Sequence, residues 1–154
     1  MRILVLSDSH GDVCSLCAIL RMHREADFVL FLGDGEDDFF GIQAQELLKN
    51  KRFEAFCGNC DFYSTLPKEK LMTIADKRIL AMHGHTKSVK YGLESLIDAA
   101  KAQNADIAVY GHTHEPHTEN SSGIQIMCPG AVKDGSYGII DITDRGTICY
   151  TAEL

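Results

Sequence analysis

Five short segments carry residue types that often bind metal ions, and each segment directly follows an apolar stretch of the chain. If those stretches are strands, their ends can meet at one edge of a sheet, where loops form the usual ligand crevice. Glycines beside the polar residues let the backbone approach an ion or a phosphate group closely. In chain order the segments are Asp8-Ser9-His10, Gly33-Asp34, Gly58-Asn59, His83-Gly84-His85 and Gly111-His112-Thr113-His114.

Each segment taken alone has a simpler explanation, because an aspartate can cap a helix and Gly-Asp is a common turn. Together they place carboxylate, amide and imidazole groups after five strands, and helix capping does not require so many imidazoles. Such ligands suit manganese, iron, zinc, cobalt or nickel better than calcium or magnesium, which prefer oxygen. Two such ions about 3.5–4 Å apart need a bridging carboxylate and hydroxide, as in phosphatases and nucleases. The chemistry indicated is metal-ion catalysis, with one aspartate bridging the two ions.

The elements that must position these residues begin with a β-α-β-α-β pattern in the first seventy residues. In the helix predicted over residues 12–25, Asp12 is the expected N-cap and the apolar stripe includes Leu16, Cys17 and Leu20. A second helix is predicted over IQAQELLKN. The strands are predicted over the apolar runs RILVLSD, DFVLFLGD and FEAFCGN.

The pattern changes after Pro67 to a predicted antiparallel hairpin, KLMTIA and ILAMHGH, because no room exists for a crossover helix. One more amphipathic helix is predicted over residues 89–103. The rest is nearly all strand: DIAVYGHTH, HTEN turning into IQIMCPG, and a YGIIDI–TICYTA hairpin. This favours an α/β fold of two stacked mixed sheets flanked by helices, although a single large mixed sheet fits the pattern too.

The bulk composition predicts an ordinary globular protein with one domain over residues 1–154, since 45% of the residues are hydrophobic and 24% are charged. A net charge of −7 disfavours extended nucleic-acid binding, which depends on many lysines and arginines. No apolar run reaches the roughly 20 residues of a membrane helix, and polar residues interrupt the N-terminal run where a signal peptide would continue. We therefore expect a cytoplasmic protein without membrane contacts; its oligomeric state, including a homo-oligomer, stays open.

The six cysteines are expected to be reduced thiols. The pairs Cys14-x-x-Cys17 and Cys57-x-x-Cys60 offer a structural zinc site or a redox site as a chemical alternative. However, 39 residues separate the pairs, more than the roughly 15–20 of a common four-cysteine pattern. The first pair also lies inside a predicted helix, so this alternative is disfavoured.

The order D-x-H, GD, GN, H and GH-x-H resembles the calcineurin-like metallophosphoesterase superfamily through nearly the whole chain, and GHTH is especially characteristic. The short length and the GNCD sequence are most similar to the small YfcE-type phosphodiesterases of bacteria and archaea. This resemblance implies a four-layer α-β-β-α sandwich formed by a single metallophosphoesterase domain.

The resemblance also implies a two-metal site that hydrolyses a small phosphodiester through a metal-bridging hydroxide. Manganese is the first expectation for both ions, with iron or zinc next and nickel or cobalt compatible. Phosphodiesters are favoured over monoesters by resemblance alone. Asp34, which would bridge both ions, and Asn59 are also the expected catalytic residues. By resemblance the first metal would be held by Asp8, His10 and His114, and the second by Asn59, His83 and His112.

Many members of this superfamily carry a histidine after the GN asparagine, where this chain has Cys60. A thiol is a weak proton donor, so esters with good leaving groups should suffer least, and His85 is the candidate substitute acid. Any of Asp37, Asp38 and Asp61 could orient a metal ligand, but they are interpreted as solvated loop carboxylates without a catalytic role. The remaining histidines, His23 and His117, are interpreted as structural or exposed.

The alternative of a different class is a non-catalytic metal-binding or protein-interaction scaffold, because a retromer subunit uses this same fold as an interaction surface. The ligand inventory discriminates between the two, since a pure scaffold has no physical need for all seven metal-binding side chains. Here all seven are present.

Overall fold

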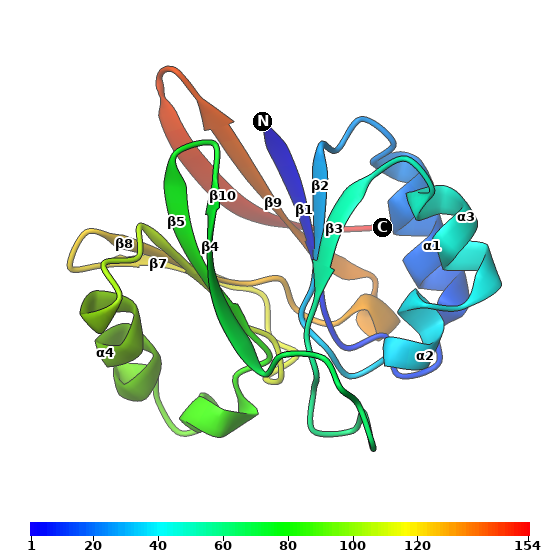
Figure 1. The fold of residues 1–154 in the computed structure, drawn as a ribbon, viewed down its shortest axis with the longest axis horizontal. Helices are drawn as coiled ribbons and strands as arrows, with labels where there is room; N and C mark the ends of the chain where they lie inside the picture. Colours follow the sequence, from blue (N-terminus) through cyan, green and yellow to red (C-terminus); the bar gives the residue numbers. More distant parts are fainter.

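The computed structural model describes residues 1–154, which form two five-stranded sheets packed face to face (Figure 1). The first sheet has the order β10-β9-β1-β2-β3 and consists of β1 (Arg2–Leu6), β2 (Phe28–Phe31), β3 (Arg52–Ala55), β9 (Ser136–Thr143) and β10 (Gly146–Glu153). The second has the order β4-β5-β6-β8-β7 and consists of β4 (Glu69–Ile74), β5 (Lys77–Met82), β6 (Ile107–Val109), β7 (His117–Ser121) and β8 (Ile124–Cys128). Two stacked sheets are therefore confirmed, and a single large sheet is excluded.

Both sheets are mixed. In the first, β1, β2 and β3 are parallel and β9 returns antiparallel to β1. In the second, β5, β6 and β8 are parallel, and β4 and β7 add antiparallel edges. The carboxyl ends of the parallel strands carry the loops with the candidate ligands, so the sheet topology decides where those loops go.

Helices cover the two outer faces of the sandwich and complete four layers (Figure 1). On the first sheet lie α1 (Val13–Met22), α2 (Glu36–Phe39) and α3 (Ile42–Leu48), while α4 (Glu94–Ala102) covers the second. Two single-turn 3-10 helices lie in loops, η1 (His85–Lys87) and η2 (Val132–Asp134). None of the helices is long and apolar enough to cross a membrane.

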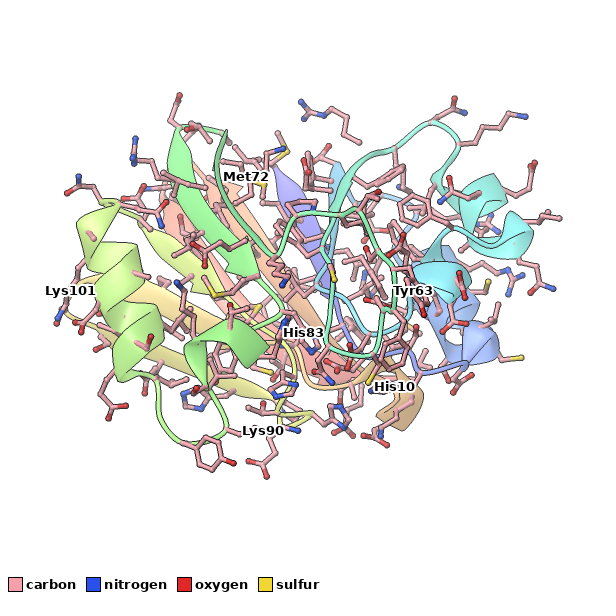
Figure 2. The ribbon with its side chains drawn as sticks, turned by 60° about the horizontal axis from the view of Figure 1, so that its bottom comes forward. His10, Tyr63, Met72, His83, Lys90 and Lys101 are labelled. Atoms are coloured by element: carbon pink, nitrogen blue, oxygen red, sulfur yellow. The ribbon has the colours of Figure 1, made fainter.

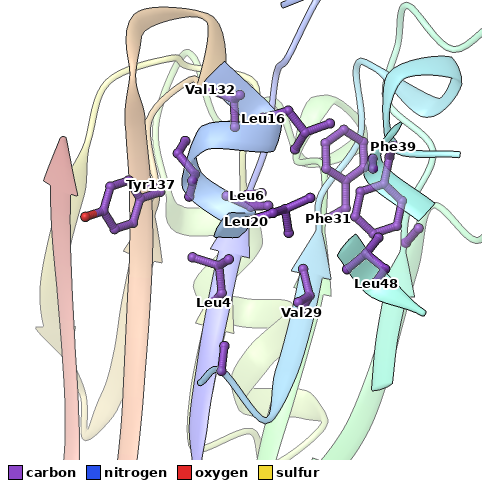
Figure 3. Close-up of a cluster of buried hydrophobic side chains, with 14 of the residues drawn as sticks. Leu4, Leu6, Leu16, Leu20, Val29, Phe31, Phe39, Leu48, Val132 and Tyr137 are labelled. Carbon is purple, nitrogen blue, oxygen red and sulfur yellow. The ribbon is translucent and has the colours of Figure 1, made fainter. Parts of the chain in front are cut away.

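Three hydrophobic clusters hold the layers together, and β1 contributes to two of them. Leu4 and Leu6 face the helices, whereas Ile3 and Val5 face the second sheet. Because both faces of β1 are buried, its sequence is a continuous apolar run. Figure 3 shows the helix-side cluster, in which the Phe31 and Phe39 rings stack at a centroid distance of 4.7 Å.

The local predictions agree with the structure except around two helices. Asp12 does cap α1, since its Oδ1 accepts the Ser15 N–H at 3.0 Å. The helix predicted over residues 89–103 begins only at Glu94, because Gly92 has a φ of +154° that a right-handed helix does not allow. Helix α2, only four residues long, was not predicted.

Candidate metal centre

The five candidate segments lie on loops that follow β1, β2, β3, β5 and β6. Figure 2 shows His10, from the first sheet, near His83, from the second, at the same end of the sandwich. Backbone hydrogen bonds join these loops to their neighbours, from Asp8 N–H to the Gly33 carbonyl and from Gly111 N–H to the His83 carbonyl, each at 2.9 Å. The predicted meeting of the five segments is therefore observed.

Two glycines make this close approach of the loops possible. A Cβ at position 58 would lie 2.0 Å from Asp34 Oδ1. A Cβ at position 111 would lie 2.0 Å from Ser7 Oγ and 2.9 Å from Asp8 Oδ2. A side chain at either position would push a candidate ligand out of place, which explains the Gly-Asn and Gly-His pairs physically.

The first group of converging side chains is Asp8, His10 and His114. His114 Nε2 lies 3.1 Å from Asp8 Oδ1 and 3.3 Å from His10 Nε2. Asp8 is fully buried, and its Oδ2 accepts the backbone N–H of His112 at 3.0 Å. That bond fixes the carboxylate and ties the loop after β1 to the loop after β6.

The second group of converging side chains is Asn59, His83 and His112, with the fully buried His83 between the other two. The His83 Nδ1 lies 3.0 Å from the Leu32 carbonyl oxygen, which can only accept, so Nδ1 donates there and Nε2 is the ring nitrogen that faces the centre. This Nε2 faces Asn59 Oδ1 at 3.1 Å and His112 Nδ1 at 3.2 Å. Burial, followed by the effects of His83 and Lys90, lowers the pKa of His112 to about 4, which keeps its imidazole neutral at pH 7.

Asp34 lies between the two groups. Its Oδ2 is 3.8 Å from His10 Nε2 and 3.5 Å from His83 Nε2, while its Oδ1 accepts the Cys60 backbone N–H at 2.7 Å. Burial tends to raise the pKa of Asp34, but the hydrogen bond and charge of His83, together with the Cys60 N–H, hold it well below the usual range. The carboxylate is therefore ionised, with one oxygen anchored and the other facing both groups.

This donor set fits divalent metal ions. Around His83 Nε2 an amide oxygen, an imidazole nitrogen and a carboxylate oxygen converge at 3.1–3.5 Å, and these are ligand atoms that divalent transition-metal ions take. Two nitrogen ligands, each about 2.0–2.1 Å from a tetrahedral ion, lie roughly 3.3 Å apart. His83 Nε2 lies 3.2 Å from His112 Nδ1, and His10 Nε2 lies 3.3 Å from His114 Nε2. Both distances agree with that spacing.

Several candidate ligands have a strained backbone, with φ in the left-handed region that residues other than glycine rarely adopt. Such a conformation costs on the order of 1–3 kcal/mol per residue and persists where the surrounding structure imposes it, often at functional sites. The residues are Asp8, His10, Asp34, His112 and His114, with φ between +45° and +71°.

The interpretation of Asp61 as a solvated loop carboxylate is wrong. Its two oxygens accept backbone N–H groups from Asp34, Gly35, Glu36 and Gly58 at 2.8–2.9 Å. Asp61 therefore ties the loop after β3 to the loop after β2, and so positions two segments of the centre. The GNCD sequence was the only local signal for this role.

The Asp38 carboxylate is also hydrogen-bonded within the protein rather than solvated. Its Oδ2 accepts the Ser9 hydroxyl at 2.6 Å and the Gly11 N–H at 2.8 Å. Asp38 thereby holds the loop that carries His10. Asp37, in contrast, is exposed on α2, as expected.

His85 lies beside the second group, with its ring centroid 5.4 Å from that of His83 and 6.2 Å from that of His112. Its Nδ1 is buried without a hydrogen-bond partner, and burial, then the neighbouring His83, lowers its pKa. The other two histidines lie away from both groups. His23 packs on Tyr137, and His117 lies 3.3 Å from Glu119.

The cysteine pairs do not form a zinc site. All six cysteines are free, and Cys14 and Cys17 belong to none of the groups that could hold a metal. Cys17 is buried in the core, as its place in the α1 stripe predicted. Cys60, in contrast, lies beside His10 and Asp34 at the centre, where burial and the neighbouring Asp34 raise the pKa of its thiol.

A four-layer sandwich with carboxylate and imidazole groups gathered on the loops at one end is the architecture of the metallophosphoesterases. The sequence profile of the calcineurin-like phosphoesterase superfamily domain matches residues 1–145. The chain therefore belongs to the calcineurin-like phosphoesterase superfamily, as the motif order had predicted.

Named relatives agree with this family. Over 137 residues the chain is 30% identical to the probable metallophosphoesterase YsnB of Bacillus subtilis (strain 168), covering 86% of this chain and 76% of YsnB. It is 28% identical over 169 residues to the phosphodiesterase YfcE of Escherichia coli (strain K12), covering 92% and 88% of the two chains.

Two solved structures with lower identity support the fold alone. An archaeal phosphodiesterase covers the whole of both chains with a TM-score of 0.79 at 22% identity. Vps29 of Entamoeba histolytica complexed with zinc has a TM-score of 0.73 at 19% identity, covering 99% of both chains.

Proposed function

We propose that residues 1–154 form a single metallophosphoesterase domain that hydrolyses small phosphodiesters with two divalent metal ions. Asp8, His10 and His114 hold one ion, Asn59, His83 and His112 hold the other, and Asp34 is shared. The observation that carries this proposal is the position of Asp34 Oδ2, which faces His10 and His83 at 3.8 and 3.5 Å. A single oxygen placed between two groups of metal-ligating atoms suits a bridging ligand.

When bound, the two ions would activate a water molecule and offset charge on the phosphoryl oxygens. The chain's own residues orient the reaction. The anchored Oδ1 of Asp34 keeps Oδ2 fixed between the two groups, and the Asn59 amide turns its oxygen toward the second group. His85 lies at the edge of that group and supplies the proton to the departing alkoxide.

Phosphodiesters are preferred to monoesters in this proposal because a relative that matches along most of both chains is named as a phosphodiesterase. The net charge of −7 argues for a small ester rather than an extended nucleic acid. Manganese is the proposed ion, because carboxylate and imidazole ligands with open positions suit it.

The test begins with protein stripped of metal by chelation, to which manganese, nickel, cobalt, zinc or magnesium is added back separately. Hydrolysis of bis(p-nitrophenyl) phosphate is followed beside that of p-nitrophenyl phosphate. Asp34→Asn removes the shared ligand, and Asp144→Asn, in the exposed β9–β10 turn, is the matched control. We expect manganese to restore diester hydrolysis in the wild type and in the control, and Asp34→Asn to abolish it.

The competing function is a scaffold that binds metal without hydrolysis, and Vps29 with zinc is a protein of the same fold that was crystallised with a metal ion. Metal binding measured by calorimetry separates the two functions. If ions bind with the expected ligand dependence but neither ester turns over with any metal, the scaffold replaces the phosphodiesterase.

A further inference from the structure

A third group of metal-capable atoms overlaps the centre described above. The ligand atoms of His10, Asp34 and Cys60 all lie within 4.8 Å of one another. His10 and Asp34 also belong to the proposed two-ion centre, whereas Cys60 takes part in neither of the two other groups. The sulfur of Cys60 therefore adds a different kind of ligand atom at the edge of the same site.

The position of this sulfur is fixed from two sides. The Cys60 backbone N–H donates to Asp34 Oδ1 at 2.7 Å, which holds the residue against the aspartate. The Asn59 Nδ2 donates to Cys60 Sγ at 3.2 Å, so the side chain is oriented as well. The Gly58 N–H at the start of this turn donates to Asp61 Oδ2 at 2.8 Å and limits its movement.

Thiolate differs from the other ligands of the centre in its choice of metal. Soft sulfur ligands favour zinc, cadmium and similar ions, whereas carboxylates favour hard ions such as manganese. A Zn–S bond is about 2.3 Å and a Zn–N bond about 2.0–2.1 Å, so sulfur and nitrogen on one ion lie well within the 4.8 Å limit of this group.

We propose that Cys60 is a conditional metal ligand, which binds thiophilic divalent ions together with His10 and Asp34 at a position overlapping the first metal site. When the ion binds, the Sγ–H bond breaks, its proton passes to solvent, and a sulfur electron pair forms the bond to the metal. A hard ion such as manganese leaves the thiol protonated and uses Asp8, His10, His114 and Asp34.

This inference rests on the proposed metal centre, because His10 and Asp34 are shared. It also has a functional consequence. A thiophilic ion held by Cys60 draws two ligands away from the catalytic arrangement, so zinc and cadmium should displace manganese from the first site. The centre would then discriminate between metals through one residue outside the family's seven ligand positions.

The experiment uses cobalt as a spectroscopic probe in the full chain. Cobalt bound by thiolate shows a sulfur-to-metal charge-transfer band in the near ultraviolet, while weak visible bands report cobalt in the site whatever its ligands. Cys60→Ser removes the sulfur. The matched control is Cys14→Ser, since Cys14 is also exposed but belongs to none of the metal-capable groups.

We expect the charge-transfer band in the wild type and in Cys14→Ser, and its loss in Cys60→Ser with the visible bands retained. Calorimetry gives a second measurement: Cys60→Ser should lower cadmium affinity at least about tenfold and leave manganese affinity within about twofold. Circular dichroism checks that each variant is folded.

The outcomes are distinguishable. Visible bands without a charge-transfer band in the wild type would overturn the role of Cys60 and leave the two-ion centre standing. A charge-transfer band that survives in Cys60→Ser would assign the sulfur ligand to another cysteine. Absence of every cobalt band would remove the proposed centre, and the role of Cys60 with it.

Discussion

The side-chain amide of Asn59 donates a hydrogen bond to the sulfur of Cys60 at 3.2 Å, and the same amide presents its Oδ1 to His83 Nε2 at 3.1 Å. An amide has two different ends, so a donor contact at one end decides that oxygen is at the other. Cys60 thereby helps to orient a proposed metal ligand. A serine hydroxyl at position 60 can accept the same hydrogen bond, so Cys60→Ser removes the sulfur while the amide keeps its orientation.

Replacing this cysteine by a better proton donor should change which esters the protein hydrolyses. Cys60→His places an imidazole where many members of the superfamily carry histidine, and general acid catalysis contributes about 10²–10⁴-fold when the leaving group is poor. We expect turnover of alkyl phosphodiesters to rise at least about tenfold, with little change for p-nitrophenyl esters. Steady-state kinetics on a p-nitrophenyl and an alkyl diester check this, and an equal change on both esters would contradict it.

His85 should matter for the same esters in the opposite direction. His85→Gln removes the proposed proton donor, so alkyl ester hydrolysis should fall about 10²-fold while p-nitrophenyl turnover changes little. Because the pKa of His85 is lowered, His85 loses its proton at a lower pH than an ordinary histidine does. Wild-type turnover of the alkyl ester should therefore decline as pH rises through that lowered pKa.

The control for this prediction is His117→Gln, which alters a histidine on β7 outside the metal groups. Its kinetics should match those of the wild type on both esters. An alkyl-ester pH profile that persists unchanged in His85→Gln would assign the proton to another group.

Asp61 should stabilise both the fold and the centre, because it accepts four backbone N–H groups from two loops. Asp61→Ala leaves these donors without their acceptor, and we expect a loss of about 2–3 kcal/mol in unfolding free energy. Manganese affinity should fall about 10–100-fold, because the loops that carry Asp34 and Asn59 lose their tether. Denaturant unfolding and calorimetry measure the two effects.

Asp37→Ala is the control for Asp61→Ala, since Asp37 is an exposed carboxylate near the same loops. It should change both measurements little. Wild-type manganese affinity in a folded Asp61→Ala variant would show that the tether is unnecessary for the centre.

A second stability prediction concerns pH. The Arg2 guanidinium makes two 2.8 Å hydrogen bonds to Asp141 and lowers the pKa of that carboxyl. The pair therefore contributes stability above the unfolded aspartate pKa of about 3.9, and this contribution is lost as pH falls through the lower folded pKa. Because Arg2 is 36% exposed, Asp141→Asn should cost only about 1 kcal/mol at pH 7.

The difference between wild type and Asp141→Asn should shrink as the pH falls below about 4. Denaturant unfolding at pH 7 and pH 3 measures it, with Asp144→Asn as the control in the neighbouring turn. A constant difference at both pH values would mean that packing or an uncharged hydrogen bond, rather than the charge of Asp141, stabilises the pair.

The sequence by itself determined the features that depend on neighbours along the chain. The apolar runs predicted the strands, Asp12 predicted the α1 cap, and the short connection, too short for a crossover helix, predicted the β4–β5 hairpin. The polar residues after the strands predicted which side chains could meet. These predictions succeeded because strand patterning, capping and tight turns are local interactions.

Apart from what the family resemblance implied, only the tertiary structure decided which candidate side chain faces which. Asp8 and His114 are 106 positions apart, yet their side chains lie 3.1 Å from each other, because β1 and β6 end at the same end of facing sheets. The antiparallel pairing of β9 with β1 and the anchoring role of Asp61 likewise depend on contacts between distant segments. No local pattern encodes such contacts, because their geometry exists only once the two sheets have packed together.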